Sequence, residues 1–243
     1  MKSLTILSFV LLLTLALSTS CTSDDCITGE GNIVTETLDL EPLDAITLMG
    51  SNNVSIKQGD IQEIKVTGYP NIIKELNRSV NNKHWEIRLD DACYKNADYS
   101  VEITIPFLTE ADLTGSGNII VYDFIEQGGQ TYRLLGSGNL SLGANSGTEA
   151  LNVFLTGSGN VMSNADFTNL KSMDINITGS GDFSGFATTT NTCNINVSGS
   201  GNSNVYVQDE LNVSITGSGN VNYKGDPLIK SSITGSGKVV DSN

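Results

Sequence analysis

The chain has 243 residues, of which 38% are apolar and only 16% are charged, and its formal net charge at pH 7 is −14. It contains 25 glycines but only 4 prolines, a composition unlike that of a collagen, a long helical bundle or a highly charged disordered chain. The acidic excess also argues against a nucleic-acid partner, because nucleic acids bind to basic surfaces.

The first 20 residues have the pattern of a secretory signal peptide. A basic start, Met1-Lys2, precedes an apolar run from Leu4 to Leu17, whose 14 residues are too few for a membrane-spanning helix of ~20. The segment Leu17-Ser-Thr-Ser-Cys21 resembles a lipobox, although the leucine stands four residues before the cysteine instead of three. We predict residues 1–20 to be a lipoprotein signal peptide and Cys21 to be the lipidated residue. The alternative is ordinary secretion with Cys21 unmodified.

Residues 21–35 are predicted to form a tether. The acidic start of the tether, Thr22-Ser-Asp-Asp25, resembles the export signal that sends Bacteroidota-type lipoproteins to the cell surface. The sequence therefore predicts an outer-membrane lipoprotein of the cell envelope, surface-exposed, whose membrane contact is the N-terminal lipid. Removal of residues 1–20 takes away Lys2 and no acidic residue, so the net charge changes from −14 to −15.

Short strands are predicted throughout residues 36–110. Several stretches alternate between apolar and polar residues and end in turns, as strands with one buried face do. These stretches are residues 46–51, 54–59, 64–68, 85–89 and 101–105. A brief helical turn is predicted at Ile72–Leu76. We expect this part to form irregular β coils that cap a more regular stack.

Residues 111–243 carry a repeat. The tripeptide Gly-Ser-Gly recurs at intervals of 21, 21, 22, 20, 18 and 18 residues, and such self-similarity indicates a repeat architecture. In nearly every copy, apolar residues stand two and four residues before the tripeptide and four residues after its first glycine, with polar residues between them. The first glycines are Gly115, Gly136, Gly157, Gly179, Gly199, Gly217 and Gly235.

A unit of 18–22 residues made of strands and turns predicts an all-β, right-handed parallel β-helix-like solenoid with about three short strands in each coil. A β-propeller is the rival architecture, but its blades need ~40 residues. Glycine at the corner allows a positive φ, and asparagine beside it tolerates left-handed geometry and bonds to nearby backbone. Stacked corners therefore predict a structural turn ladder. Besides the glycines, the ladder contains the residue that follows each tripeptide: Asn118, Asn139, Asn160, Asp182, Asn202 and Asn220, with Lys238 in the last copy.

Three cysteines remain besides Cys21. They are Cys26, Cys93 and Cys193, and an odd number cannot all pair within the chain. Their spacings of 67 and 100 residues match neither a zinc site nor a redox motif. A Cys26–Cys93 bridge in an oxidising compartment and free, inert thiols are both open alternatives.

The motifs resemble a known family. Leu113-Thr-Gly-Ser-Gly-Asn118 and Ile215-Thr-Gly-Ser-Gly-Asn-Val221 are similar to the auto-transporter adhesin head domain, the GIN domain family. The order of parts is similar too: a lipoprotein signal, two short strand motifs at 46–50 and 54–59, Val-x-Ile-x-Ile-Pro at 101–106, and then the glycine repeats. The resemblance covers roughly residues 36–240. It implies a surface or envelope protein of Bacteroidota type with a β-helical body and an adhesive role, and it carries no catalytic residues.

The sequence predicts no enzyme, metal or cofactor. The single histidine, His84, has no Gly-x-Ser-x-Gly nucleophile motif beside it, and we interpret it as a solvent-facing strand residue. The tripeptides lack the Gly-Lys-Ser/Thr of a phosphate loop, and the single carboxylate at the corners, Asp182, is too few for calcium. Polysaccharide-cleaving enzymes need converging carboxylates or a basic residue, yet from Leu134 onward the chain has no arginine or histidine.

Three hypotheses for the function remain. The first is a non-catalytic adhesion or binding module with a glycan or a protein as ligand, and the second is a structural envelope protein without a specific ligand. A polysaccharide-active enzyme is the least favoured. An exposed aromatic cluster drawn from Tyr94, Tyr99, Tyr206 and Tyr223 would favour binding. A groove with three or more converging ionisable groups would favour catalysis.

Overall fold

The computed structural model describes residues 26–125 and 128–243. The predicted signal peptide, the predicted lipidation site Cys21 and the first residues of the predicted tether lie outside the described residues. The described chain forms a β-solenoid of about six turns, which confirms the predicted fold class. Within these residues, no helix is long and apolar enough to cross a membrane.

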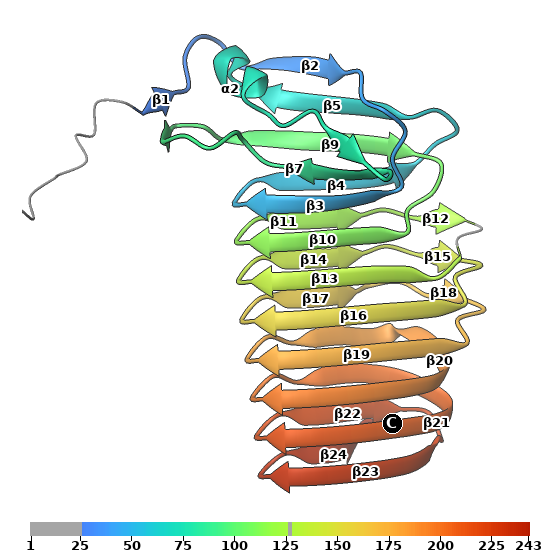
Figure 1. The fold of residues 1–243 in the computed structure, drawn as a ribbon. Helices are drawn as coiled ribbons and strands as arrows, with labels where there is room; N and C mark the ends of the chain where they lie inside the picture. The colour runs from blue at the N-terminus through green and yellow to red at the C-terminus, as the bar shows by residue number, and fades with distance from the viewer. Residues whose placement is uncertain (1–25, 126–127) are drawn as a thin grey trace, which may run out of the picture.

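Each coil consists of two main strands that meet at a glycine corner (Figure 1). The first sheet contains β3 (Ala45–Gly50), β10 (Glu110–Gly115), β13 (Gln130–Gly136), β16 (Ala150–Gly157), β19 (Ser172–Gly179), β23 (Leu228–Gly235) and the later parts of β20 (Phe183–Gly199) and β21 (Ser203–Gly217). The second sheet contains β4 (Asn53–Gln58), β11 (Asn118–Val121), β14 (Asn139–Leu142), β17 (Asn160–Ser163), β22 (Asn220–Lys224), β24 (Lys238–Asp241) and the starts of β20 and β21.

A third, short sheet closes the middle coils. It is formed by β12 (Phe124–Ile125), β15 (Asn145–Ser146) and β18 (Phe167–Thr168). In Figure 1 the first-sheet strands run from right to left in front, the second-sheet strands lie behind them, and the chain descends from β10 to β23, which makes the coil right-handed.

A continuous column of apolar side chains fills the solenoid. Parallel pairing aligns equivalent residues, so that Leu113 pairs with Leu134 and Leu134 with Leu155. All three are at most 1% exposed. Because side chains of a strand point alternately to its two faces, the residues between them lie on the solvent face.

The first glycine of each corner makes the turn. Gly50 and the seven glycines of the repeat have φ between +118° and +135°. The carbonyl oxygen of Gly136 accepts hydrogen bonds from the N–H groups of Ser158 and Gly159 in the next coil, at 2.9 and 3.1 Å. A Cβ on Gly157 would collide with this same oxygen. Both the conformation and the close approach of neighbouring coils therefore require glycine.

The corner asparagines differ from the expectation of left-handed geometry. The described non-glycine residues with positive φ are Asn82, Lys83, Asn96 and Asn169, none of which follows a Gly-Ser-Gly tripeptide. Since the first glycine makes the left-handed step, the asparagine is free to begin the next strand, as Asn118 does in β11.

A cap covers the N-terminal end of the stack. The chain builds the coil β3–β4, passes into the cap, and returns to β10, so that β3 pairs with β10 on one side and with β7 (His84–Ile87) on the other. On the second sheet, β4 lies between β11 and β9 (Tyr99–Ile105). The cap is completed by β2 (Val34–Leu38), β5 (Glu63–Gly68), β6 (Val80–Asn81) and α2 (Pro70–Lys74).

The structure of the cap differs from the sequence predictions in one strand and in the helix. The strand at residues 64–68 runs antiparallel to β9 and to β2, and so closes the sheet instead of continuing a coil. The helix begins at Pro70, two residues before the predicted turn, because proline is favoured at the first position of a helix.

A disulfide ties the start of the described chain to the cap. Cys26 and Cys93 are bonded, which decides between the two alternatives left open by the sequence. They flank β1 (Ile27–Thr28) and β8 (Tyr94–Lys95), which pair in a separate two-stranded sheet. Cys193 is free and buried, and burial raises the pKa of its thiol, so it is the inert thiol that the sequence allows for.

Candidate functional site

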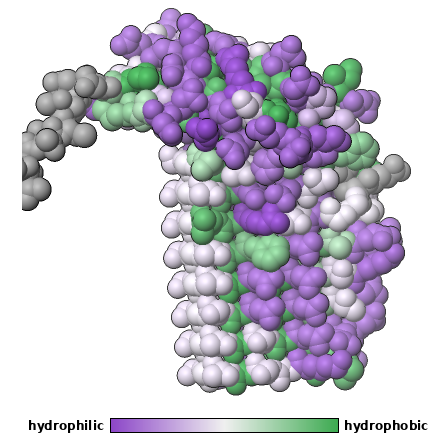
Figure 2. Space-filling view, in the orientation of Figure 1, coloured by the Kyte–Doolittle hydropathy of each residue, from purple (hydrophilic) through white to green (hydrophobic). Residues whose placement is uncertain are grey.

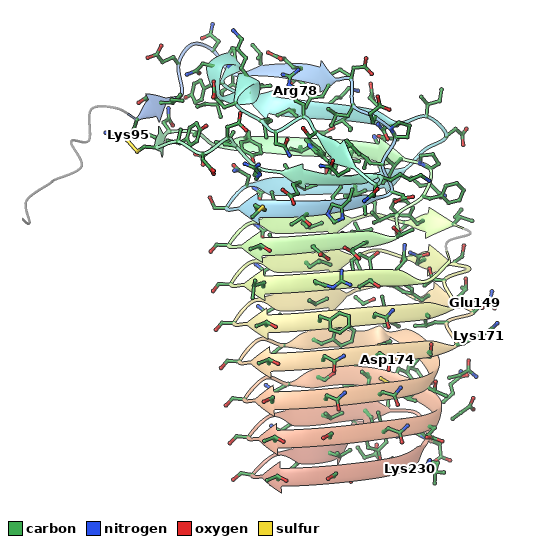
Figure 3. All side chains as sticks on the ribbon, in the orientation of Figure 1. Arg78, Lys95, Glu149, Lys171, Asp174 and Lys230 are labelled. Atoms are coloured by element: carbon green, nitrogen blue, oxygen red, sulfur yellow. A yellow bond between two sulfur atoms is a disulfide. The ribbon has the colours of Figure 1, made fainter. Side chains whose placement is uncertain are left out.

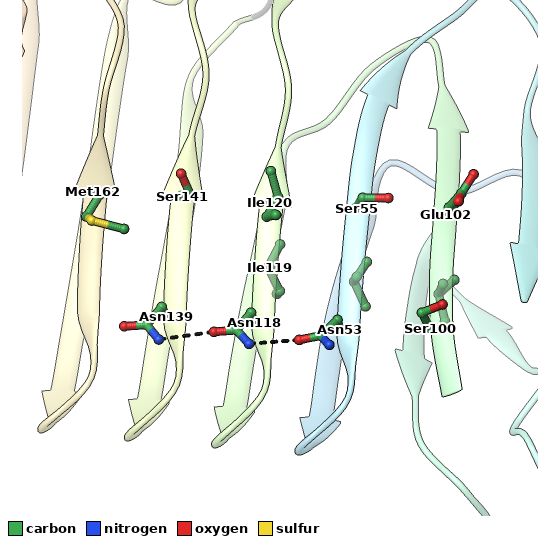
Figure 4. Close-up of a pocket in the computed structure, with 12 residues that line it drawn as sticks. Asn53, Ser55, Ser100, Glu102, Asn118, Ile119, Ile120, Asn139, Ser141 and Met162 are labelled. Atoms are coloured by element: carbon green, nitrogen blue, oxygen red, sulfur yellow. Dashed lines mark hydrogen bonds between the residues drawn. The ribbon is translucent and has the colours of Figure 1, made fainter. Parts of the chain in front are cut away.

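A row of amides runs along the outer face of the second sheet. Asn118 donates to the side-chain oxygen of Asn53 at 2.7 Å, and Asn139 donates to that of Asn118 at 3.0 Å (Figure 4). Further along the stack, Asn160 donates to Asn139 at 3.2 Å and Asn202 donates to Asp182 at 2.9 Å. Each amide keeps hydrogen-bonding capacity beyond these contacts, which remains available to a ligand.

A groove lies beside this row at the N-terminal end of the second sheet. It has a volume of about 610 Å³ and crosses the strands β9, β4, β11, β14 and β17. In Figure 4, Ile120 stands between Ser141 and Ser55, with Glu102 beyond Ser55 and Met162 beyond Ser141. Ile120 is 42% exposed and Met162 is 37% exposed. The groove therefore combines an apolar centre with hydroxyl, amide and carboxylate groups.

A second hollow continues the groove along the strands. Its volume is about 390 Å³, and its lining includes Lys57, Glu102 and the exposed ring of Tyr122. Together the two hollows offer one carboxylate, one ammonium, one aromatic ring and a row of amides. This combination suits ligand binding by contact and hydrogen bonding. Among the described residues, no group of three or more His, Cys, Asp or Glu side chains could hold a metal ion.

The opposite face, on the first sheet, carries a charged cluster near the cap. Arg133 forms ion pairs with Glu110 at 2.7 Å and with Asp112 at 3.3 Å. Its guanidinium lies 5.5 Å from the ring centre of Phe154, and His84 lies 3.9 Å from Glu110. Burial raises the pKa of Asp112 to about 6; the negative charge of Glu110 acts in the same direction, and Arg133 and His84 oppose it.

This cluster is assembled from segments that are far apart in the sequence. His84 and Glu110 stand in one row of the sheet with Ala45 between them, and the small alanine side chain leaves room for the imidazole to approach the carboxylate. His84 also shares a 2.7 Å hydrogen bond with the Thr47 hydroxyl. His84 is thus an outward-facing strand residue that lies half-buried within a polar network on the outer face. Because Arg133 pairs with both carboxylates, the cluster is an internally satisfied ion-pair network and not a free acid–base pair.

A third polar area lies on the first sheet towards the C-terminal end. Asn212 donates to Asn194 at 3.0 Å, and Asn196 donates to Asn176 at 3.1 Å. A hollow of about 460 Å³ is lined there by Asn194, Asn212 and Lys230 among others. Figure 2 shows purple, hydrophilic side chains on this face, separated from the pale column at the corners by a narrow green strip.

The four tyrosines whose clustering would favour binding do not gather on one face. Tyr99 is only 5% exposed and lies with Tyr94 at the cap, whereas Tyr206 and Tyr223 lie on the last coils of the stack. The four rings are separated because their strands belong to opposite ends of the solenoid.

Sequence reasoning also missed the groove on the second sheet. Its signal is an apolar residue, Ile120 or Met162, at an outward position where four other copies carry serine or asparagine and the last carries Val240.

Several solved bacterial structures share this fold. A putative adhesin from Bacteroides fragilis has a TM-score of 0.80 at 18% identity, with 89% of this chain and 100% of that chain covered. A putative lipid binding protein from Parabacteroides distasonis has a TM-score of 0.74 at 26% identity, covering 89% and 99%. A putative adhesin from the same species has a TM-score of 0.68 at 20% identity, covering 90% and 100%. No curated protein matches the chain.

The sequence also matches a family model. Residues 42–227 match the model described as "Putative auto-transporter adhesin, head GIN domain". This span begins just before the first coil and includes most of the cap and the stack. The chain therefore belongs to the auto-transporter adhesin head GIN domain family.

Proposed function

We propose that this protein is a non-catalytic adhesion module of the bacterial cell surface, and that it binds a repeating glycan in the groove on the second sheet. The observation that carries the proposal is the groove itself, with Ile120 at its centre, Met162 at its β17 end, Glu102 at its β9 end, and amides and hydroxyls between them. A sugar ring has an apolar face and a polar edge, and this lining offers partners for both.

The stacking of coils supports a repeating ligand. The asparagine row recurs on neighbouring strands that are ~4.8 Å apart, so a polymer lying across the strands meets an amide on each strand from β4 to β17. The family description and two of the similar structures are named for adhesion, which supports the same role.

Attachment to the cell surface is the second part of the proposal. Cys21 carries the lipid in an outer membrane, and residues 21–35 hold the solenoid away from it. Replacement of Cys21 by serine is expected to move the protein from the membrane fraction to the soluble fraction. Retention of the Cys21→Ser protein with membranes contradicts the lipid anchor.

The binding role is tested with the mature chain on glycan and protein arrays. Ile120→Glu and Met162→Glu place a charge in the groove at exposed positions that do not support the core, and both are expected to weaken binding at least about tenfold. Leu135→Glu is the matched control, because Leu135 is 53% exposed on the first sheet. Binding to proteins alone contradicts the glycan ligand, and binding to neither favours a structural envelope role.

A lipid is the second candidate ligand. The exposed Ile120 and Met162 favour it, and the similar protein with 26% identity is named a putative lipid binding protein. Displacement of a fluorescent fatty acid by unlabelled lipid, abolished by Met162→Glu but not by Leu135→Glu, would support this function over glycan binding.

A further inference from the structure

The outward side chains along the groove form a row that crosses five strands of the second sheet. In order along the stack, the row consists of Ser55, Ile120, Ser141, Met162 and Ser184, and the strand register pairs each with the next. Figure 4 shows the first four at about the same level on their strands. Hydroxyl and apolar groups therefore alternate from strand to strand, with an apolar group on every second strand.

The neighbouring row of amides does not alternate. Asn53, Asn118, Asn139 and Asn160 occupy consecutive strands, and each of the last three donates to the asparagine that precedes it in the row. This row lies two residues, or ~6.6 Å, along the strands from the alternating row. The groove thus presents an amide on every strand beside an apolar group on every second strand.

The alternation gives the ligand a length scale. Neighbouring strands are ~4.8 Å apart, so Ile120 and Met162 stand ~9.6 Å apart across the sheet. One sugar of an extended β-1,4-linked polysaccharide is about as long as one strand spacing, and each sugar is turned over relative to the one before it. Such a chain repeats every two sugars, which is close to the distance between the two apolar side chains.

The edge of such a chain matches the row group by group. When each sugar carries an acetamido group at C2, one edge of the chain presents acetamido and hydroxymethyl groups on alternate sugars. The acetamido methyl groups then meet Ile120 and Met162, and the hydroxyl groups meet the serines between them. A chain of plain glucose places hydroxyl groups against both apolar side chains, where those hydroxyls lose hydrogen bonds to water. Tyr122, just after β11, is 53% exposed and offers a flat surface to the sugar rings at the flank.

Charge restricts the ligand further. Among the residues that line the groove, Glu102 is the only charged one, and Lys57 lines the adjoining hollow instead. Two charged residues of the stack, Asp174 and Lys230, lie on the first sheet, away from the groove (Figure 3). Since the chain as a whole carries a charge of −14, a polymer of uronic acids is repelled, whereas an uncharged polymer of acetamido sugars is not.

We propose that the groove binds a β-1,4-linked polymer of 2-acetamido sugars, which lies across the strands on its edge and places one acetamido group on Ile120 and the next on Met162. This assignment rests on the proposed binding of a glycan and names the class of glycan. The alternating row spans five strands, so it holds about five sugars. Affinity is therefore expected to rise with chain length up to about five sugars and then to level off.

Titration calorimetry of the mature Cys21→Ser chain with two pentamers tests the class of glycan. We expect the β-1,4-linked pentamer of N-acetylglucosamine to bind at least about tenfold more tightly than that of glucose. Ile120→Ser and Met162→Ser are each expected to reduce this preference, whereas the control Leu135→Ser, on the first sheet, keeps it. Equal binding of the two pentamers, or tighter binding of the glucose pentamer, overturns the assignment but leaves a glycan-binding groove. Binding of no glycan overturns both.

Two rearranged variants test the alternation itself. Ile120→Ser/Ser141→Ile keeps the composition of the row but places the apolar groups on adjacent strands, and it is expected to lose the preference. Ser55→Ile/Ile120→Ser/Ser141→Ile/Met162→Ser shifts the whole pattern by one strand and is expected to keep it, because the ligand shifts by one sugar. All four positions face outward, and urea denaturation checks that both variants fold. An unchanged preference in the first variant, or none in the second, overturns the match of periods.

The same acetamido repeat occurs in homopolymers of N-acetylglucosamine and in the glycan strands of bacterial cell walls. Competition between the N-acetylglucosamine pentamer and peptide-free cell-wall strands distinguishes these two sources. Displacement of the pentamer by the strands supports a cell-wall ligand, and binding of the pentamer without displacement supports the homopolymer.

Discussion

At the scale of single residues, the first glycine of each corner meets two separate demands. It holds a positive φ, and the absence of a Cβ lets the carbonyl group of the previous coil approach. Gly157→Ala violates both demands, whereas Gly50→Ala violates only the first, because a Cβ at Gly50 meets no other atom within 4 Å. We expect a loss of unfolding free energy of about 1 kcal/mol for Gly50→Ala and at least about 3 kcal/mol for Gly157→Ala, measured by urea denaturation. Equal losses would contradict the packing argument.

A second prediction for a single residue is that Asp112 makes the stability of the protein depend on pH. Burial raises the pKa of its carboxyl from 3.8 to about 6, so the folded state holds this proton more tightly than the unfolded state does. The stabilisation is therefore present at low pH and is lost as the pH rises through about 4 to 6. Over this window, wild type is expected to lose up to about 3 kcal/mol relative to Asp112→Asn in urea denaturation. Parallel pH profiles of the two proteins would show that Asp112 does not titrate in this range.

At the scale of elements, the repeat accounts for most of the stack. The spacing of the tripeptides and the period-2 alternation around them lead directly to strands, corners and parallel pairing. The cap does not follow from these patterns, because β5 and β9 pair antiparallel and the chain returns to β10 only after the cap is built. The groove also escapes sequence reasoning. It needs β9 beside β4, and residues 47 positions apart, such as Asn53 and Ser100, become neighbours only through that pairing.

The disulfide gives a prediction for one pair of elements. The disulfide joins two cysteines that are 67 residues apart in the sequence. Strand β1 also pairs with β8, and Asn71 donates a hydrogen bond to the Thr28 carbonyl at 2.8 Å. In a Cys26→Ser/Cys93→Ser protein, we expect faster hydrogen exchange in β1 and β8 and a cap destabilised by about 2–4 kcal/mol. The coils from β13 to β21 are expected to keep their protection, because coils in a solenoid contact only their neighbours. Faster exchange throughout the stack would contradict this independence.

At the scale of the whole molecule, stability is expected to fall towards the last described coil, β23–β24. Every inner coil is held by a neighbour on each side, and β3–β4 are held by β10–β11 and by the cap. The last coil has one neighbour, and its inward Ile233 is 40% exposed, so it opens at the lowest cost in free energy. Hydrogen exchange followed by mass spectrometry should therefore show β23 and β24 as the least protected strands of the two main sheets. Equal protection of β3 and β23 would mean that the cap contributes nothing to the stability of the coil beneath it.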